Sequence, residues 1–290
     1  MLNSQSKRIL VTMPHYCQRD SDKFNKSKEI RSMSLARSVS SFVQQAGHAQ
    51  MFLNFTEQAA QFANCANQQT CDVFICTTGG DHLLDELDLL TGMYHHVKTD
   101  AHPKVLGYTC REVLKNFKGK YDYYCYVEDD LFINDPLFFN KLAWFSEHAG
   151  GRCLLQPNRC ETSFSSYTKK CYIDGDIPPE NNPYFRPGLP VLTLPAFGIN
   201  FDFVPATNPH SGCYFLNAEQ FEYWAEQPHF NDLDMSWVGP LESAASLGVM
   251  KTFSIYKPAW HNANFLEICH FGDAYLQMIA EDFTITSHFQ

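Results

Sequence analysis

Short apolar runs alternate along the first half of the chain with longer segments whose apolar residues recur every three or four positions. Residues 8–13 (RILVTM) and 72–77 (DVFICT) are apolar and partly β-branched, which predicts two buried strands. Between them, apolar residues from Leu35 to Ala46 recur at helical spacing and predict a helix that Gly47 ends. Residues 51–55 predict a further strand. This order of strand, helix and strand indicates a parallel sheet with crossover helices.

The same alternation continues to about residue 150. A 3.6-residue period between residues 104 and 117 predicts a helix that leads into the sequence YDYYCYVEDDLF at residues 121–132. Asp135 is a suitable cap for a helix that begins at Pro136 and ends at Gly150. The first half of the chain therefore reads as a βα-type unit.

The second half of the chain has a less regular pattern. Residues 154–157 predict a short strand, and residues 174–195 form a segment rich in Pro, Asn and Gly, which is typical of a lid or a binding loop. Residues 212–216 predict a strand, and Asn217 with Gln220 resembles a capping box at the start of a helix over residues 218–226. An aromatic block at residues 255–272 carries His261 and His270.

Composition and charge narrow the classes of function. The formal net charge is -10, which argues against nucleic-acid binding and means that a polyphosphate substrate needs a bridging metal. The eleven cysteines are odd in number and contain no CxxC pair, so we expect reduced, mostly buried thiols in a cytoplasmic protein. Zinc binding by Cys153, Cys160 and Cys171 is disfavoured, because short paired ligand spacings are missing. No stretch approaches the ~20 apolar residues of a transmembrane helix, so any membrane association is expected to be peripheral.

The acidic triplet Glu128-Asp129-Asp130 ends the aromatic strand predicted at residue 121 onward. A buried strand normally ends in turn residues, and three adjacent carboxylates need a counter-ion such as a divalent metal. Ligands of open α/β sheets bind beyond the carboxyl ends of the strands, where this triplet is expected to lie. The alternative is a solvated acidic turn that caps the next helix.

This layout resembles the GT-A glycosyltransferases, and the triplet is similar to the EDD form of their DxD motif. The resemblance implies an α/β, GT-A-like fold with a Rossmann-like mixed central sheet flanked by helices and an irregular second half. Residues 1–135 are then expected to bind the nucleotide-sugar, and residues 136–290 to bind the acceptor and carry catalysis, in one compact domain of two lobes.

The resemblance also implies a metal site. Asp130 would coordinate Mn²⁺ or Mg²⁺, with Glu128 and Asp129 assisting at the ribose or at a metal-bound water. In several GT-A families a late histidine completes the metal shell, so His270 is the second candidate ligand, and imidazole suits Mn²⁺. An ordinary hydrogen-bonded core histidine is the alternative for His270.

A candidate catalytic base lies at residues 237–245, where a turn leads into a short helix that begins at Pro240. Inverting GT-A enzymes place an acid at such a helix start, and Glu242 matches that position. Trp237 is a candidate platform for a sugar ring, and Asp234 is the reserve candidate for the base. Alternatively, Glu242 only complements the helix dipole.

Nucleotide contacts are expected where the first strands end. These positions are Pro14, His15 and Tyr16 after one strand and Thr77 after another, with Tyr16 stacked on the base. Arg111, on the helix before the acidic strand, is a candidate phosphate contact, although a surface arginine is the commoner role.

The sequence thus predicts a hexosyltransferase-like glycosyltransferase with a nucleoside-diphosphate sugar donor, a UDP-sugar, and a glycan or other hydroxyl acceptor. The presence of Glu242 favours inversion slightly. A nucleotidyltransferase is the nearest enzymatic alternative, but His15 and Tyr16 do not form a Gly-rich, basic phosphate loop. A non-catalytic glycan- or protein-binding module is the alternative from another class.

Overall fold

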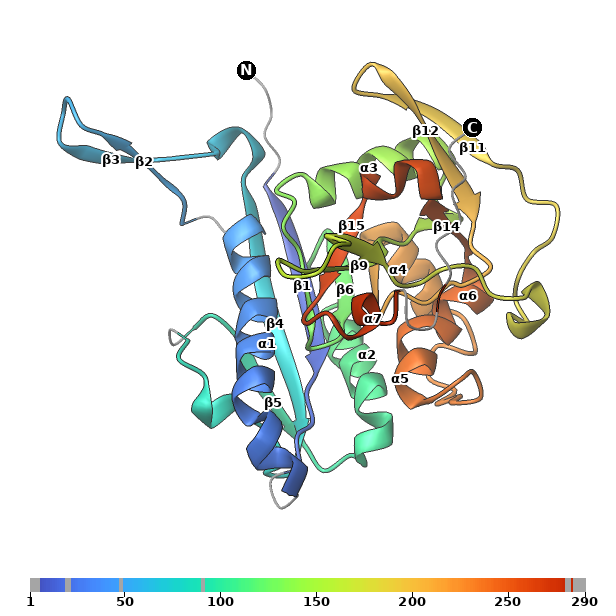
Figure 1. The fold of residues 1–290 in the computed structure, drawn as a ribbon, viewed down its shortest axis with the longest axis horizontal. Helices are drawn as coiled ribbons and strands as arrows, with labels where there is room; N and C mark the ends of the chain where they lie inside the picture. Colours follow the sequence, from blue (N-terminus) through green and yellow to red (C-terminus); the bar gives the residue numbers. More distant parts are fainter. Residues whose placement is uncertain (1–5, 19–21, 47–48, 90–91, 280–282, 284–290) are drawn as a thin grey trace.

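A five-stranded sheet in the order β13-β6-β1-β4-β5 forms the centre of the computed structural model, which describes residues 6–18, 22–46, 49–89, 92–279 and 283. The parallel strands are β1 (Lys7–Pro14), β4 (Gln69–Thr78), β5 (His95–Thr99) and β6 (Tyr123–Val127), and β13 (Cys213–Asn217) is antiparallel to β6. The prediction of an α/β fold with a mixed central sheet flanked by helices is confirmed (Figure 1).

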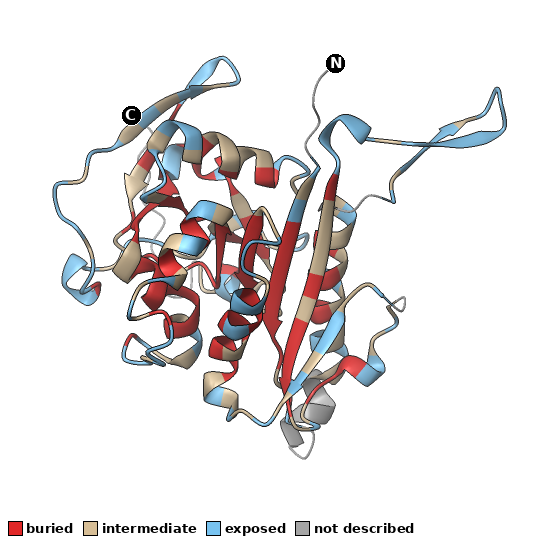
Figure 2. Ribbon diagram, turned by 180° about the vertical axis from the view of Figure 1, so that it is seen from behind, coloured by how far each residue is buried: buried red, intermediate tan, exposed pale blue. Residues whose placement is uncertain are grey.

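The alternation of side chains along β1 divides the core into two layers. Ile9 and Val11 pack on the face that α1 (Asp22–Ala46) covers, whereas Leu10 packs on the face that α2 (Leu106–Asn116) covers. Such a strand is apolar throughout because helices bury both of its faces. The predicted stop at Gly47 lies outside the described residues. Figure 2 shows β1 and β6 buried over most of their length.

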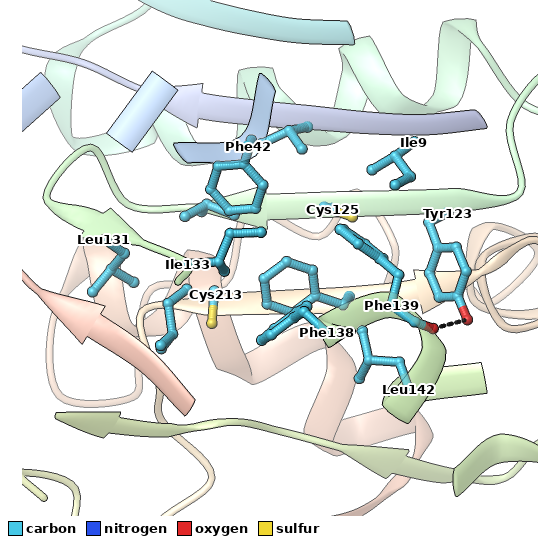
Figure 3. Close-up of a cluster of buried hydrophobic side chains, with 14 of the residues drawn as sticks. Ile9, Phe42, Tyr123, Cys125, Leu131, Ile133, Phe138, Phe139, Leu142 and Cys213 are labelled. Atoms are coloured by element: carbon cyan, nitrogen blue, oxygen red, sulfur yellow. Dashed lines mark hydrogen bonds between the residues drawn. The ribbon is translucent and has the colours of Figure 1, made fainter. Parts of the chain in front are cut away.

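Aromatic side chains join the two halves of the chain in one core (Figure 3). Phe42 of α1 and Phe138 of α3 (Phe138–Ala149) both pack on Phe215 of β13, with ring centroids 6.4 and 4.8 Å away. Each buried aromatic ring contributes about 1.5–3 kcal/mol. The helix α3 begins two residues later than predicted, because Asp135 Oδ1 accepts the N–H of Leu137 in a turn that precedes it.

Two further sheets are built mainly from the second half. One has the order β10-β9-β15-β7, from β7 (Leu131–Phe132), β9 (Asn158–Thr162), β10 (Lys170–Tyr172) and β15 (Glu267–His270). The other has the order β11-β12-β14-β8, from β8 (Cys153–Leu155), β11 (Leu192–Ala196), β12 (Ile199–Pro205) and β14 (Ser254–Pro258). The loop predicted at residues 174–195 is thus correct over most of its length, but its last residues belong to β11.

The strand predicted at residues 51–55 exists, but it lies outside the central sheet. β2 (Met51–Asn54) pairs with β3 (Ala59–Phe62) in a separate hairpin, which Figure 1 shows standing away from the body. Its apolar side chains are largely exposed, including Phe52 at 65%. An apolar run therefore predicted the strand correctly but not its burial.

The remaining helices are short. They are α4 (Ala218–Ala225), α5 (Pro240–Glu242), α6 (Gly248–Thr252) and α7 (Ala274–Gln277), with 3₁₀ segments at Cys65–Asn67, Leu84–Glu86, Pro103–Val105, Pro179–Asn181 and Trp260–Phe265 and a π-helical segment at Ser243–Leu247. The capping box of α4 is confirmed, since Asn217 and Gln220 exchange hydrogen bonds of 2.8 and 3.2 Å. All eleven cysteines are free thiols, as predicted. Within the described ranges, no helix has the length and apolar character needed to cross a membrane.

Candidate active site

The acidic triplet lies where β1, β4 and β6 end together at one edge of the central sheet. The backbone N–H of Glu128 donates to the carbonyl of Gly212 (2.9 Å), so the start of the antiparallel strand β13 closes this edge. Directly after the triplet, β7 turns into the second sheet, where His270 of β15 is paired with Leu131. Two sheets therefore meet at the triplet.

Glu128 is the most buried of the three carboxyl groups. Burial, and then the negative charge of Asp130, raises the pKa of Glu128 to about 8, although Arg159 acts in the opposite direction. The carboxyl packs against Gly212, where a Cβ atom would lie 2.7 Å from Oε2 of Glu128. Gly212 also has a φ of +64°, so both its backbone and the close approach favour glycine there. Burial thus favours the protonated form of the Glu128 carboxyl in the folded chain.

Asp129 is held by His15, which follows β1 directly. His15 is fully buried, and its Nε2 accepts the backbone N–H of Leu83 (3.0 Å). The ring hydrogen of the neutral form therefore sits on Nδ1, which lies 2.5 Å from Asp129 Oδ2 and donates to it. This hydrogen bond fixes the Asp129 side chain at the sheet edge.

Asp130 faces His270 on the other side of the triplet. Its Oδ2 lies 3.4 Å from His270 Nε2, and its Oδ1 is buried with no hydrogen-bond partner among the described residues. Burial alone would lower the pKa of His270, but the hydrogen bond and charge of Asp130 hold it above the usual value. Burial alone would raise the pKa of Asp130, but His270 holds it below the usual value. Both pKa shifts favour a charged His270 beside a charged Asp130 carboxylate.

Glu161 of β9 lies directly behind His270, and the sequence did not single it out. It is fully buried, and its Oε1 accepts from His270 Nδ1 at 2.8 Å. Its Oε2 accepts the backbone N–H of Leu276 in α7 at 2.7 Å. A carboxylate behind one ring nitrogen of a histidine turns the other nitrogen toward a metal site. No local motif marks Glu161, because β9 meets β15 only in the folded chain.

The site offers two donors for a metal ion, an oxygen of Asp130 and a nitrogen of His270. No group of three His, Cys, Asp or Glu side chains in the described part of the chain is arranged to hold a metal. The mixed oxygen and nitrogen donors and the unpartnered Asp130 Oδ1 fit Mn²⁺ better than Mg²⁺. The remaining coordination positions would belong to non-protein ligands.

A buried ionic network, which sequence reasoning also missed, lies behind the triplet. Arg159 of β9 lies 2.7 Å from Asp174 Oδ1 and 3.9 Å from Glu128 Oε2. Lys257 of β14 lies 3.8 Å from Asp174 Oδ2 and donates to the carbonyl of His210 at 2.5 Å. Burial lowers the pKa of Lys257, and the charge of Asp174 opposes that shift. The two cations balance part of the negative charge at the edge.

The two candidate bases have different surroundings. Glu242 is half-buried on α5, folds back over Gly239, and adds to the negative charge that raises the Glu128 pKa. No described group donates a hydrogen bond to its carboxylate. Asp234 instead lies 2.7 Å from Lys251 Nζ, whose hydrogen bond lowers the pKa of Asp234 to about 2. Glu242 therefore lies within electrostatic reach of Glu128 with no ion pair among the described residues, whereas Asp234 is paired with Lys251.

Two sequence-based assignments are wrong. Trp237 is only 6% exposed, packs in the core on the α2 side, and donates its ring N–H to the carbonyl of Asn181, so it offers no free face to a sugar. Arg111 is 1% exposed, and its guanidinium lies over the rings of Tyr108 and Trp224 and donates to backbone carbonyls. Burial in an aromatic core therefore removes Arg111 from any phosphate.

The other predicted nucleotide contacts lie at the strand ends. Pro14 is buried and closes β1, and Tyr16 is half-buried and packs beside the core on the α2 side. Thr77 is buried in β4, and its hydroxyl lies 2.7 Å from His96 Nε2. The structure thus brings Pro14, Tyr16 and Thr77 to the expected edge, where nucleotide binding stays a prediction.

No protein-family model matches the sequence, and no curated protein matches it significantly. S. aureus TarS is similar in structure over 86% of this chain and 35% of its own, with 11% identity and a TM-score of 0.41. A protein named as a nucleotide-diphospho-sugar transferase of Desulfovibrio desulfuricans G20 is similar over 57% of this chain and 62% of its own, with 13% identity and a TM-score of 0.29. The chain spans about a third and about three fifths of these two chains, and likenesses this distant concern only the course of the backbone.

Proposed function

We propose that the chain is a divalent-metal-dependent glycosyltransferase that moves a sugar from a nucleoside-diphosphate donor, a UDP-sugar, to a hydroxyl acceptor. The observation that carries this proposal is the pairing of Asp130 with His270 at the end of β6, with one buried Asp130 oxygen unpartnered. In this role Glu128-Asp129-Asp130 is the EDD form of the DxD motif.

Asp130 and His270 would hold Mn²⁺ or Mg²⁺, and the imidazole donor favours Mn²⁺. The bound cation would supply the positive charge that stabilises a departing nucleoside diphosphate. Arg159 and Lys257, the two cations of the ionic network behind the triplet, already face Asp174 and are not free for that purpose.

In this proposal the nucleoside binds at the carboxyl ends of β1 and β4. Asp129 is held in one orientation by His15 and can accept a hydrogen bond from a ribose hydroxyl. Glu242 would take the proton of the acceptor hydroxyl as that oxygen attacks the anomeric carbon, which gives inversion. Its half-buried carboxylate has no ion pair among the described residues, in contrast to Asp234.

The test is a panel of nucleotide sugars incubated with the protein and either Mn²⁺, Mg²⁺ or a chelator, with donor consumption followed by mass spectrometry. We expect consumption of a UDP-sugar that requires the cation. Donor consumption that persists in the chelator, or no consumption of any donor, contradicts the proposal.

The role of Glu242 is tested separately with Glu242→Gln. We expect normal binding of UDP and Mn²⁺ with transfer reduced by about 10²–10⁴-fold. Asp234→Asn is the matched control and keeps transfer near the wild-type rate, because Asp234 is engaged by Lys251. Wild-type transfer by Glu242→Gln would exclude Glu242 as the base.

A further inference from the structure

A cavity of about 300 Å³ lies beside the ionic network and is not used by the donor site proposed above. Its lining includes Arg159, Asp174, Asn208, Lys257 and Trp260. This volume is at the small end of the range for small-molecule sites, roughly 300–1,000 Å³, and suits a ligand of monosaccharide size.

Trp260 gives the cavity an exposed aromatic wall. It is 83% exposed, whereas Trp224 and Trp237 are buried in the core. It stands at the start of the 3₁₀ segment Trp260–Phe265, and its ring touches only the edge of His261 among the aromatic contacts of the described residues (5.3 Å). An indole ring presented in this way can stack on the C–H face of a sugar ring.

Asp174 supplies an unsatisfied polar group in the same cavity. Its side chain is 4% exposed, and Oδ1 is bound by Arg159. Oδ2 is buried with no hydrogen-bond partner among the described residues, and Lys257 Nζ lies 3.8 Å from it, beyond hydrogen-bond distance. A buried acceptor of this kind costs about 1–3 kcal/mol unless a donor reaches it. A ligand hydroxyl group is a suitable donor.

The charges of the cavity select a neutral ligand. The lining carries two cations and two carboxylates. Arg159 and Lys257 both face Asp174, at 2.7 and 3.8 Å. Asp176 accepts a hydrogen bond from Thr207.

The amide of Asn208 also lines the cavity; it donates to the carbonyl of Gly175 and accepts from the N–H of His210, which leaves its second N–H for a ligand hydroxyl. The aromatic face of Trp260, the unsatisfied oxygen of Asp174 and the paired charges of the lining are together suited to a neutral ring that carries several hydroxyl groups.

The cavity adjoins the acidic edge through one side chain. The guanidinium of Arg159 reaches Glu128 with one nitrogen and Asp174 with another, at 3.9 and 2.7 Å. A ligand beside Asp174 is therefore separated from the triplet by a single guanidinium group.

We propose that the Trp260–Asp174 cavity is a saccharide-binding subsite that holds the sugar acceptor, a role that rests on the function proposed above. Trp260 stacks on the ring, and Asp174 Oδ2 accepts a hydrogen bond from a hydroxyl. The acceptor platform is thus Trp260 rather than the buried Trp237.

The test uses methyl glycosides of glucose, galactose and N-acetylglucosamine as probes, without nucleotide or metal, and saturation-transfer NMR with tryptophan fluorescence as readouts. We expect saturation transfer to at least one glycoside and a change in the emission of Trp260. Trp260→Ala should remove both signals. Phe55→Ala, an exposed aromatic change on the β2–β3 hairpin, is the matched control and should keep both.

Asp174→Asn is the second variant and should weaken the binding of the same glycoside about tenfold, because an amide nitrogen or a neutral oxygen replaces the buried carboxylate. Binding of UDP with Mn²⁺ is measured on every variant and should be unchanged in Trp260→Ala.

The outcomes separate the two proposals. Glycoside binding that survives in Trp260→Ala, or no saturation transfer to any of the three glycosides, overturns the subsite and leaves the donor site standing. Glycoside binding that depends on Trp260 in a protein that binds no UDP with Mn²⁺ overturns the transferase function and keeps the subsite as part of a binding module.

Discussion

Each of the two histidines that flank the acidic triplet faces one of its aspartates with one ring nitrogen, but the other ring nitrogen has a different partner in each case. His15 Nε2 accepts a backbone N–H, so its Nδ1 hydrogen is committed to Asp129. His270 Nδ1 instead faces the carboxylate of Glu161, which leaves Nε2 directed at Asp130. The partner behind the ring therefore makes His15 a clamp for one carboxylate and His270 a candidate cation ligand.

The largest expected effect separates the two aspartates. Asp130→Asn should weaken Mn²⁺-dependent binding of UDP by about 10³-fold, or about 4 kcal/mol, because a direct charged ligand is lost. Asp129→Asn should weaken it less than about tenfold, because Asp129 is engaged by His15. Isothermal titration calorimetry with and without Mn²⁺ measures both. Equal losses of UDP affinity in the two variants would contradict the different roles assigned to Asp130 and Asp129.

Glu128 pairs with neither histidine, and its role is tested by the pH dependence of the free energy of unfolding. The folded chain keeps the Glu128 proton up to a pKa of about 8, whereas the unfolded chain loses it near 4.5, so stability falls as the pH rises between these values. Between pH 5 and 8, we expect the wild-type free energy of unfolding to fall by about 3 kcal/mol relative to Glu128→Gln. Urea denaturation in a chelator measures this difference, and parallel pH profiles for the two proteins would contradict it.

The clamp role of His15 is tested by His15→Leu. The change leaves the Leu83 N–H and the Asp129 carboxylate without a partner, so the free energy of unfolding should fall by about 2 kcal/mol. The Mn²⁺ affinity of His15→Leu should stay within about threefold of wild type. The main effect of His270→Leu should instead be a loss of Mn²⁺ affinity, with a smaller loss of stability. Thermal denaturation and Mn²⁺ titration are run on both variants. A larger affinity loss in His15→Leu would reverse the two assignments.

The smallest expected effect concerns the carboxylate behind His270. Glu161→Gln should lower the affinity for Mn²⁺ about tenfold, since the His270 ring is no longer held in the orientation that presents Nε2. Electron paramagnetic resonance titration without nucleotide measures this affinity. Glu267→Gln, a carboxyl change on β15 that faces Lys170, is the matched control and should leave it unchanged. Unchanged affinity in Glu161→Gln would leave Glu161 with a structural role only.

The tryptophans show why side-chain roles were harder to predict than elements. Trp237 is predicted to stack on a sugar because of its place beside Glu242, and no local pattern singles out Trp260. In the structure Trp237 is packed under residues from the 3₁₀ segment Pro179–Asn181, whereas Trp260 faces outward from its own segment. Burial depends on which distant segments cover a residue, and local periodicity does not contain that information.

The resemblance to GT-A enzymes supplied the choice of His270 as the partner of the acidic triplet. The sequence by itself determined several strands and helices of the first half and the position of the triplet at a strand end. These features are local, because hydrophobic periodicity and a charge cluster are visible within about ten residues. Only the tertiary structure decided that Glu161 stands behind His270, that Arg111 and Trp237 are core residues, and that Asp174 meets Arg159 and Lys257. The parallel pairing of β9 with β15 joins segments more than 100 residues apart, and such contacts arise only when the sheets form.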